Sequence, residues 1–278
     1  MTIGVVGLGV LGSNLLRYFK ESEQEAKGYD IHPEKTDTDF ETVLKQDILF
    51  LCLPTPYREG SKGYDLSILE DTLKKIADFD PEKIIIIKST VLPGTTQRLQ
   101  EQYPKLRLGF VPEFLTARYA WEDTLHPDTS IFGYTEQTYS IANDILRILP
   151  EASFERIMPA AEAEMVKIAR NNYFVSKIVF MNSLYDICQA NGIDYEIVKE
   201  SLASDRRIRR SHMEIFHQGG RGGSGVCLPK DSSAFNDYAI STGGDASKFV
   251  DTYTKINLNL VNASGKDKGN QYYTKEQE

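Results

Sequence analysis

The sequence has few cysteines and no long apolar run. Only three of its 278 residues are cysteine (Cys52, Cys188 and Cys227), and their spacing is not that of a metal site. A sparse, odd set of cysteines without a secretory signal is typical of thiols in a reducing compartment, so we expect a cytoplasmic protein that holds no metal. No stretch approaches the roughly 18 apolar residues of a membrane span. The N-terminal MTIGVVGLG lacks the basic region of a signal peptide, so we expect neither a membrane anchor nor a leader.

An excess of positive charge is also missing. The formal net charge is −8, which argues against a general nucleic-acid-binding function. Basic residues are nevertheless concentrated between positions 206 and 230, where six of them accompany the single acid Glu214: Arg206, Arg207, Arg209, Arg210, Arg221 and Lys230. This segment is either a solvated basic surface or a site that collects an anionic ligand such as a phosphate.

Length and composition predict two packed domains. A chain of 278 residues exceeds one ordinary domain, and 41% hydrophobic with 26% charged residues is a globular composition. In the first half, short β-branched runs alternate with segments of helical apolar spacing, which predicts an α/β fold with a Rossmann-type, doubly wound parallel sheet. The unbroken run of isoleucines at 84–87 is typical of a strand buried on both faces. The expected strands are 3–6, 47–53, 83–88, 106–111 and 130–133, and the expected helices are 14–19, 66–76, 95–102 and 137–148.

The second half predicts a smaller, mainly helical domain. Residues 162–190 form one expected long helix, whose apolar residues cover more than one face, so we expect it to pack on several neighbours, a second subunit among them. Five glycines between 219 and 225 predict a loop, and an amphipathic helix is expected over 246–261. The expected division is a sheet domain at 1–158, a helical domain at 159–261 and a polar, fraying tail at 262–278.

A glycine pattern after the first strand predicts a dinucleotide-binding turn. Gly7-Leu8-Gly9-Val10-Leu11-Gly12 fits G-x-G-x-x-G, and it follows a strand and opens a helix. The glycines allow a tight turn and close backbone approach, so that the helix N-terminus faces a pyrophosphate. Asp30 lies 18 residues after Gly12, where a carboxylate binds a ribose diol and repels the 2′-phosphate of NADP. The pattern therefore predicts NAD as cofactor; the alternative is a glycine-rich turn without a nucleotide.

Cys227 is the candidate nucleophile. It follows a glycine-rich stretch and precedes Lys230 in Gly225-Val226-Cys227-Leu228-Pro229-Lys230-Asp231. Nearby cations favour the thiolate form of a cysteine, which attacks carbonyl carbons. Cys52, within the apolar run LFLCLP, and Cys188, on the long helix, are expected to be packing residues.

Four other polar residues lie where a ligand is expected. Lys167 and Asn171 are four residues apart on the long helix and project from one face, although a solvent-facing pair has the same spacing. Glu113 and Thr90 each follow a predicted strand, at the carboxyl edge where α/β sheets bind ligands. Glu113 alone is equally compatible with a helix cap.

The sequence resembles the UDP-glucose and GDP-mannose 6-dehydrogenases in motifs that occur in the same order along the chain: GLGVLG, GYDIHPEK, LCLPTP with the later YDLSILE, KSTVLPGTT, VPEFL followed by LHPD, AEMVKIARNN and CLPKD. The resemblance covers about residues 1–261. It implies oxidation of a sugar C6 alcohol to a carboxylate in two steps that use two NAD, with UDP-glucose as the expected substrate. It also implies that Cys227 traps the aldehyde as a thiohemiacetal and then carries a thioester that water cleaves. Holding the intermediate on a cysteine between two hydride transfers agrees with the nucleophile predicted above.

The resemblance assigns roles to single residues. Lys167 would stabilise the oxyanion, while Asn171 and Asp231 would hold the sugar and the water. Thr90 and Glu113 would position water and assist proton transfer. Arg207 resembles an arginine that reaches the substrate across a dimer interface, which implies a homodimer built on the helical domain. The implied cofactor contacts are Gly7, Gly9, Val10, Leu11, Gly12, Asp30, Pro54, Thr55, Thr90 and Lys230, and the implied contacts with the nucleotide-sugar substrate are Glu113, Phe114, Leu115, Lys167, Asn171, Arg207 and Gly225.

Three departures from the family pattern leave alternatives open. Ala117 stands where the family has a second glutamate, the stretch 33–47 is short, and the family's C-terminal α/β domain, which helps to bind the nucleotide, does not follow. The chain ends in a polar tail, so we expect a natural short form over a truncated one. The alternatives are a relative that binds NAD or a nucleotide sugar with little turnover and has a regulatory role, and a one-step β-hydroxyacid dehydrogenase. The second alternative would not need Cys227.

Overall fold

The computed structural model describes residues 1–60, 62–217, 219–266 and 273–274, and the chain divides into two units. The first unit contains Met1–Thr55 and Leu66–Lys167, and the second contains Pro56–Asp65 and Ile168–Glu278. The division expected between residues 158 and 159 lies instead between Lys167 and Ile168, within one helix, because the first turns of that helix pack against the sheet. The second unit also includes the segment 56–65, which the sequence analysis had placed in the sheet domain.

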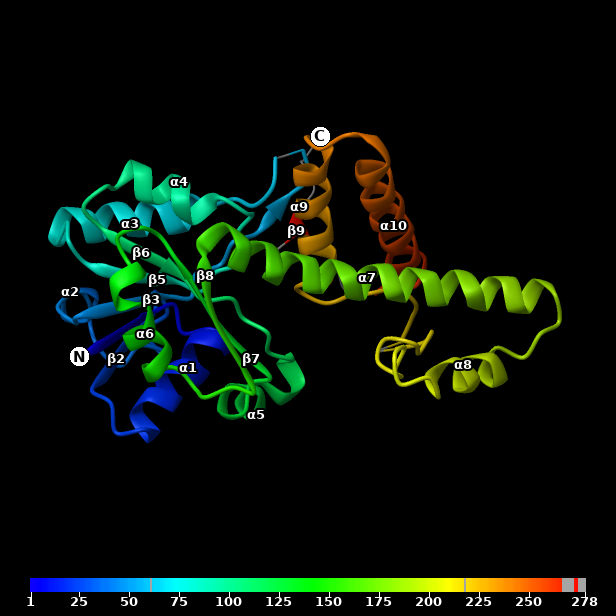
Figure 1. Cartoon of the computed structure of the whole chain (residues 1–278), viewed down its shortest axis with the longest axis horizontal. Helices are drawn as coiled ribbons and strands as arrows, with labels where there is room; N and C mark the ends of the chain where they lie inside the picture. Colours follow the sequence, from blue (N-terminus) through cyan, green and yellow to red (C-terminus); the bar gives the residue numbers. More distant parts are fainter. Residues whose placement is uncertain (61, 218, 267–272, 275–278) are drawn as a thin grey trace. The chain divides into compact units, whose positions relative to one another are not determined.

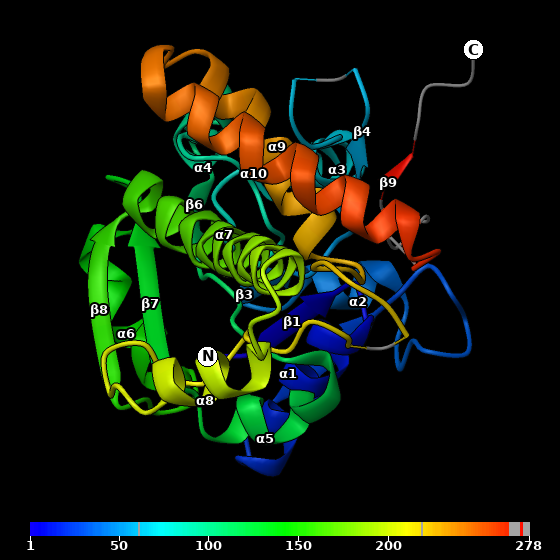
Figure 2. The ribbon, with the colours of Figure 1, turned by 90° about the vertical axis from the view of Figure 1, so that its right-hand side faces the viewer.

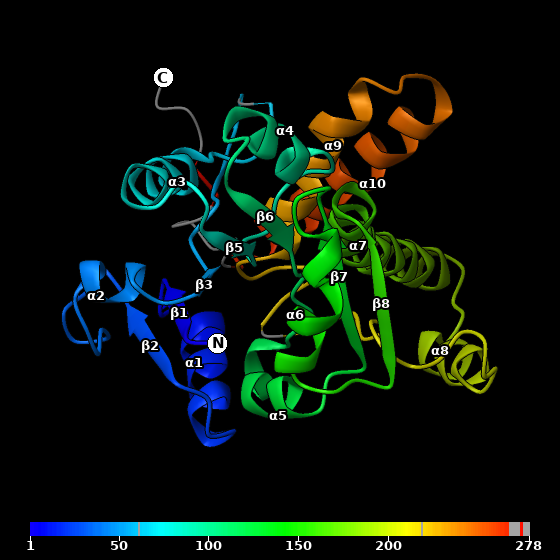
Figure 3. The ribbon, with the colours of Figure 1, turned by 60° about the vertical axis from the view of Figure 1, so that its left-hand side comes forward.

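A seven-stranded sheet forms the centre of the first unit, in the order β2-β1-β3-β5-β6-β7-β8 (Figure 3). All neighbouring strands are parallel except β6 and β7, which are antiparallel. This is the doubly wound, mostly parallel sheet that the sequence predicts. The strands are β1 (Ile3–Val6), β2 (Ala26–Tyr29), β3 (Ile48–Leu51), β5 (Ile84–Ile87), β6 (Arg107–Phe110), β7 (Thr129–Tyr134) and β8 (Phe154–Pro159).

Helices cover both faces of this sheet (Figures 1 and 3). One apolar cluster joins the strands to α2 (Phe40–Leu44), α3 (Ser67–Phe79) and α4 (Thr95–Gln102), and the other joins them to α1 (Val10–Glu21) and α6 (Ala142–Ile148). The isoleucines of β5 alternate between the two clusters, with Ile85 and Ile87 in one and Ile86 in the other. The prediction of a strand buried on both faces is therefore confirmed. The remaining short elements are the 3-10 helices η1 (Ala117–Tyr119) and η2 (Tyr139–Ile141) and the helix α5 (Ala120–Leu125).

The second unit is mainly helical. Its elements are most of α7 (Ala160–Ala190), α8 (Tyr195–Ala203), α9 (Leu228–Ile240), α10 (Gly244–Ala263) and a two-residue ladder of β4 (Tyr57–Arg58) with β9 (Tyr273–Thr274). Figure 2 shows α9 and α10 together on one side of α7 and α8 on the other. Two small apolar clusters match this arrangement, because one joins α7 to α9 and α10, and the other joins α7 to α8 and the segment 213–215.

Most expected elements are present, and several short or polar ones were missed. The long helix, the glycine-rich loop at 219–225 and the last helix lie where predicted. The sequence pattern did not predict the strands β2, β4, β8 and β9, the helices α2, α5, α8 and α9, or the 3-10 helix η1. Of the tail expected to fray, residues 267–272 and 275–278 lie outside the described residues. In the part of the chain that the structure describes, no helix combines the length and hydropathy needed to cross a bilayer.

Candidate active site

The glycine turn lies at the carboxyl end of β1, where the backbone is too crowded for side chains. Gly7 has φ +91°, and a Cβ on it would lie 2.5 Å from the carbonyl oxygen of Cys52. A Cβ on Gly12 would overlap the carbonyl oxygen of Gly7. Helix α1 begins directly after Gly9, and no side chain caps its N-terminus. The uncapped backbone N–H groups of this first turn fit a pyrophosphate, as the glycine pattern predicts.

Asp30 follows β2 and lies beside the glycine turn. Its Oδ2 accepts a hydrogen bond from the backbone N–H of Leu8 at 2.6 Å, and its Oδ1 accepts one from the N–H of His32 at 2.9 Å. The carboxylate is thus held by backbone donors on both sides, next to the residues that would contact the pyrophosphate. This is the placement that recognition of a ribose diol requires.

The other residues predicted to bind the cofactor in the first unit belong to the same sheet edge. Pro54 and Thr55 follow β3, the strand next to β1, and Thr90 follows β5, the strand next to β3. The hydroxyl of Thr55 donates to the carbonyl oxygen of Thr90 at 2.7 Å. The strand order changes direction at β1, which has β2 on one side and β3 on the other, and such a switch point is where open α/β sheets bind ligands.

Glu113 follows β6, the next strand along this edge, and is held in place by three groups. Its Oε1 accepts from the backbone N–H groups of Phe114 and Leu115 at 2.6 and 2.9 Å, and its Oε2 lies 3.3 Å from the Nζ of Lys88. The ammonium of Lys167, on α7, donates to the backbone carbonyl of Glu113. Glu113 and Lys167, to which the resemblance gives separate roles, therefore meet. Lys88 was not predicted, although it directly follows the buried strand β5.

A buried glutamate fixes the start of α7 beside this edge. The carboxylate of Glu164 accepts from the N–H of Gly94 at 2.6 Å and from the N–H and hydroxyl of Thr96 at 2.8 and 2.6 Å. It supplies the N-terminal cap that α4 lacks, since Gly94 has no side chain. Burial raises the pKa of Glu164 despite these bonds. The contact anchors the helix turn that precedes Lys167.

In the second unit, Cys227 stands at the N-cap of α9, where it is exposed. Lys230 and Asp231 lie on the first turn of the helix, and both are buried. The N-terminus of a helix favours a thiolate, as a nucleophile needs. Gly225, two residues before the cysteine, has φ +82°. Neither of the other cysteines fits this role, because burial raises the pKa of Cys52 to about 12 and Cys188 is only 3% exposed.

Asp231 is the centre of a polar cluster within the second unit. It is 1% exposed, and its Oδ2 accepts from the amide of Asn171 at 2.6 Å. Its Oδ1 accepts from the ammonium of Lys230 at 2.8 Å and from the hydroxyl of Tyr64 at 2.6 Å. The predicted pair of Asn171 and Asp231 is thus brought together. Tyr64 was missed, because nothing in the sequence connects it with a residue 167 positions away.

Arg207 lies apart from this cluster. Its side chain is 83% exposed and pairs with Asp205 at 2.5 Å. Other basic residues of the segment 206–230 also have acidic partners: Arg210 with Glu200 and Glu214, Arg221 with Asp186, and Lys230 with Asp231. Acids within the segment, next to it and elsewhere in the chain therefore pair with four of its six basic residues, which weakens the interpretation of this segment as a phosphate site.

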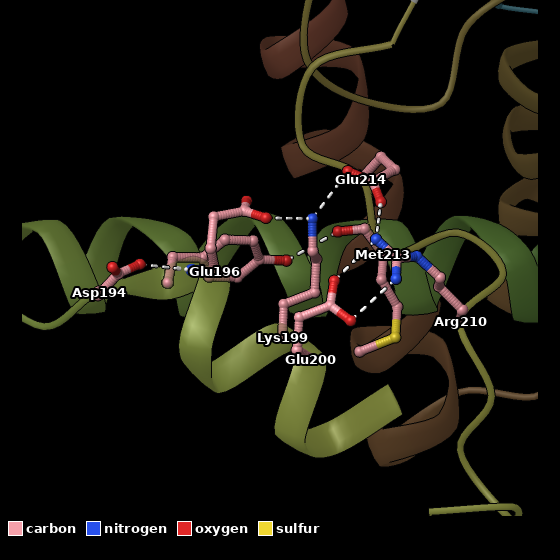
Figure 4. Close-up of polar contacts among 8 residues, drawn as sticks. Asp194, Glu196, Lys199, Glu200, Arg210, Met213 and Glu214 are labelled. Atoms are coloured by element: carbon pink, nitrogen blue, oxygen red, sulfur yellow. Dashed lines mark hydrogen bonds and ion pairs between the residues drawn. The ribbon is translucent and has the colours of Figure 1, made fainter. Parts of the chain in front are cut away.

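The segment that carries Arg207 is fastened to α8 by a buried lysine (Figure 4). Lys199 is 2% exposed, and its ammonium lies 2.6 Å from a carboxylate oxygen of Glu196 and 2.9 Å from one of Glu214. The hydroxyl of Tyr195 donates to the carbonyl of Met213 at 2.8 Å. Side chains of α8 thus hold residues 213 and 214, a few positions beyond Arg207.

The described residues contain no group of three or more His, Cys, Asp and Glu side chains placed to hold a metal ion. What they contain is a glycine turn at the switch point of a doubly wound sheet, with an acid after the second strand. These features define a dinucleotide-binding dehydrogenase fold with a helical second unit.

The comparisons identify the family. Residues 34–149 match the model described as the UDP-glucose/GDP-mannose dehydrogenase family, NAD binding domain, and residues 161–259 match the family's central domain. The chain belongs to this family, and its first unit contains an NAD-binding domain. The UDP-glucose 6-dehydrogenase AglM of Haloferax volcanii is 28% identical over 290 residues, which cover 87% of this chain and 66% of that protein. The chain spans about half to two thirds of the length of the curated relatives it matches.

Solved structures share the fold. A UDP-glucose dehydrogenase from Pyrobaculum islandicum superposes with a TM-score of 0.78 at 26% identity and covers 91% of this chain, which in turn covers 68% of that chain. A 3-hydroxyisobutyrate dehydrogenase from Mycobacterium tuberculosis has a TM-score of 0.71 and covers 96% of both chains, at 15% identity. The second similarity shows the fold alone.

Proposed function

We propose that this chain oxidises the C6 alcohol of a nucleotide sugar to a carboxylate in two NAD-dependent steps, with UDP-glucose as the leading substrate. The observation that carries the proposal is the position of Cys227, exposed at the start of α9 beside buried Lys230 and Asp231. A dehydrogenase that stops at a carbonyl product needs no such nucleophile. The names of the relatives support UDP-glucose as the sugar.

Each oxidation delivers a hydride to bound NAD, which is the chemistry that the cofactor supplies. The residues that would hold the cofactor are those of the first unit's sheet edge, with the glycine turn at the pyrophosphate and Asp30 at the ribose. The buried ammonium of Lys230, in the second unit, is a further proposed cofactor contact.

Cys227 would act between the two oxidations. Its sulfur adds to the aldehyde carbon, which keeps the aldehyde on the enzyme as a thiohemiacetal. Oxidation of this adduct leaves a thioester on the sulfur. Water then adds to the acyl carbon, the carbon–sulfur bond breaks, and the sulfur leaves as a thiolate, so that the cysteine is regenerated.

The other predicted polar residues would stabilise charge and place water. The ammonium of Lys167 is suited to an oxyanion, while Asn171 and Asp231 would hold the sugar and the water. Glu113, oriented by Lys88 and by backbone donors, and Thr90 would assist proton transfer. The proposed substrate contacts are completed by Phe114, Leu115, Gly225 and, from a second subunit, Arg207.

A panel of nucleotide sugars tests the proposal. With the best substrate, we expect two NADH for each sugar consumed and a uronic acid as product. One NADH for each molecule consumed, or activity with a small β-hydroxyacid in place of a nucleotide sugar, would contradict it and favour a one-step dehydrogenase. No NADH with any substrate would favour a binding protein.

We also propose a homodimer built on the helical unit, in a reducing compartment such as the cytoplasm. Tyr173, Phe180 and Ile187 are spaced by seven residues on α7, so they lie along one stripe of the helix. Their side chains are 62%, 62% and 57% exposed. A stripe of large apolar side chains supports burial against a second copy. None of the three cysteines forms a disulfide, which supports the reducing compartment.

A further inference from the structure

We infer that Tyr64 is a positioning residue for the carboxylate of Asp231, and that it acts through this carboxylate on hydrolysis of the thioester at Cys227. The inference rests on the proposed function, since it concerns one step of that reaction. It assigns a role to the segment 56–65, which belongs to the helical unit although it lies between two elements of the sheet unit in the sequence.

Donors from three parts of the chain reach the carboxylate of Asp231. Asn171 reaches it from α7, Lys230 is its neighbour on α9, and Tyr64 comes from the segment 56–65. A carboxylate that is 1% exposed depends on such donors to remain ionised and fixed. Tyr64 and Lys230 share Oδ1, so loss of the phenol hydroxyl would remove one of the donors that fix this oxygen and would loosen the orientation of the carboxylate.

Tyr64 is itself held in place by its own segment. It forms an antiparallel bridge with Tyr57, and the next residue, Asp65, pairs with Arg58 at 2.6 Å. The ring of Tyr64 lies 4.2 Å from the ammonium of Lys230, a cation–π contact. One side chain therefore fixes both polar groups of the first turn of α9, with the ring against the lysine and the hydroxyl against the aspartate.

The phenol acts as a donor and not as a base. Burial, and then the negative charges of Asp231 and Cys227, raise the pKa of Tyr64 well above its ordinary value. The hydroxyl thus keeps its proton at every pH at which the enzyme would work. In the hydrolysis step, a water oxygen adds to the acyl carbon and its proton passes to the Asp231 carboxylate. The carbon–sulfur bond then breaks with its electron pair on the sulfur of Cys227.

Tyr64→Phe is the variant that isolates the hydroxyl, because phenylalanine keeps the ring against Lys230. The matched control is Tyr57→Phe. Tyr57 lies in the same segment, and its hydroxyl also bonds to a carboxylate of α9, that of Asp237. Both variants are mixed with NAD and the best nucleotide sugar. Stopped-flow absorbance follows NADH formation, and intact mass follows decay of the acyl adduct on Cys227.

We expect the adduct of Tyr64→Phe to decay about tenfold more slowly, the effect of one hydrogen bond to a charged group. NADH formation should change less than about twofold. A carboxylate that loses a donor is protonated at a higher pH, so the acidic limb of the decay rate should move to higher pH. Tyr57→Phe should match the wild type in adduct decay, in NADH formation and in the pH dependence of the decay rate. If Tyr64→Phe does not fold, Tyr64→His, which keeps a donor, is measured in its place, and its adduct should decay more slowly than that of the wild type by less than about tenfold.

Two outcomes would overturn the inference, and they are distinguishable. Adduct decay at the wild-type rate in Tyr64→Phe, or an equal loss in both tyrosine variants, would overturn the role of Tyr64 and leave the proposed function intact. A wild type that forms neither NADH nor an adduct with any nucleotide sugar would overturn the proposed function, and this inference with it.

Discussion

Asp30 shows how one side chain acquires a function from its backbone neighbours. It accepts hydrogen bonds from Leu8 in the glycine turn and from His32 in its own loop. These bonds hold the carboxylate beside the turn. A 2′-phosphate at the ribose would meet this fixed negative charge.

We therefore expect the protein to bind NAD at least about tenfold more tightly than NADP, the effect of one like-charge contact near a protein surface. Asp30→Asn should reduce the ratio between the affinities for NAD and NADP. The control is Asp37→Asn, in the same loop. The carboxylate of Asp37 accepts a hydrogen bond from the backbone N–H of Gly28 at 2.7 Å. This control should leave the ratio of the NAD and NADP affinities unchanged. Titration calorimetry with both nucleotides makes the comparison. Equal affinities in the wild type, or binding of neither nucleotide, would refute the ribose assignment.

Among the elements, α8 depends on a buried ion pair. Lys199 is enclosed, while its partners Glu196 and Glu214 are 67% and 53% exposed at their side chains. The hydrogen bonds to these carboxylates raise the pKa of Lys199. The lysine therefore stays charged at neutral pH and joins α8 to the segment that carries Arg207 (Figure 4).

Lys199→Met should lower the free energy of unfolding by roughly 2 kcal/mol, since it removes hydrogen bonds between charged groups while its exposed partners regain water. Lys255→Met is the matched control, because Lys255 is 71% exposed in its pair with Asp251; its cost should be at most about 0.5 kcal/mol. Urea denaturation measures both. An equal loss of unfolding free energy in the two variants would mean that burial of Lys199 does not strengthen its ion pairs.

Elements with a strong hydrophobic pattern could be predicted from the sequence. Strands β1, β3 and β5 are continuous apolar runs, and the sequence analysis placed them within a few residues. Strand β2 (AKGY) and the exposed strand β8 (FERIMP) have little apolar pattern, because each lies at an edge of the sheet and pairs on one side alone. Helix α9 was missed because small polar residues such as Ser232 and Ser233 fill its buried face, and no apolar period marks it.

The residues of the candidate site also fall into those that local sequence predicts and those that it does not. The glycine turn, Asp30 and Cys227 are marked by local sequence, so they could be predicted. Lys88 and Tyr64 are defined by partners far away in the chain, and only the fold brings them to those partners. Local spacing carries no signal for contacts of this kind.

At the scale of the whole molecule, the apolar stripe of α7 predicts a dimer. Light scattering at micromolar concentration should give twice the 31.4 kDa mass of the chain. Phe180→Glu places a charge in the stripe and should shift the mass towards that of one chain. Phe249→Glu, at an exposed phenylalanine of α10, should leave the dimer intact. A wild type with the mass of one chain would contradict the proposed assembly.

In the proposed reaction Cys227 carries the substrate between two oxidations, and Cys227→Ser is the sharpest test of this role. The variant should still bind NAD and nucleotide sugar, since neither needs the thiol. It should lose steady-state turnover by about a thousandfold or more, because a serine hydroxyl is a poor nucleophile without a dedicated base. Cys52→Ser and Cys188→Ser, the controls, should lose stability through burial of a hydroxyl and keep their turnover.

Steady-state NADH formation and the intact mass of the protein are measured together with the best nucleotide sugar. We expect a thioester adduct on the wild type and, on Cys227→Ser, either a slowly hydrolysed ester or no adduct, with turnover lost. Near wild-type turnover in Cys227→Ser would contradict the account, because it would show that the reaction needs no covalent intermediate at this residue.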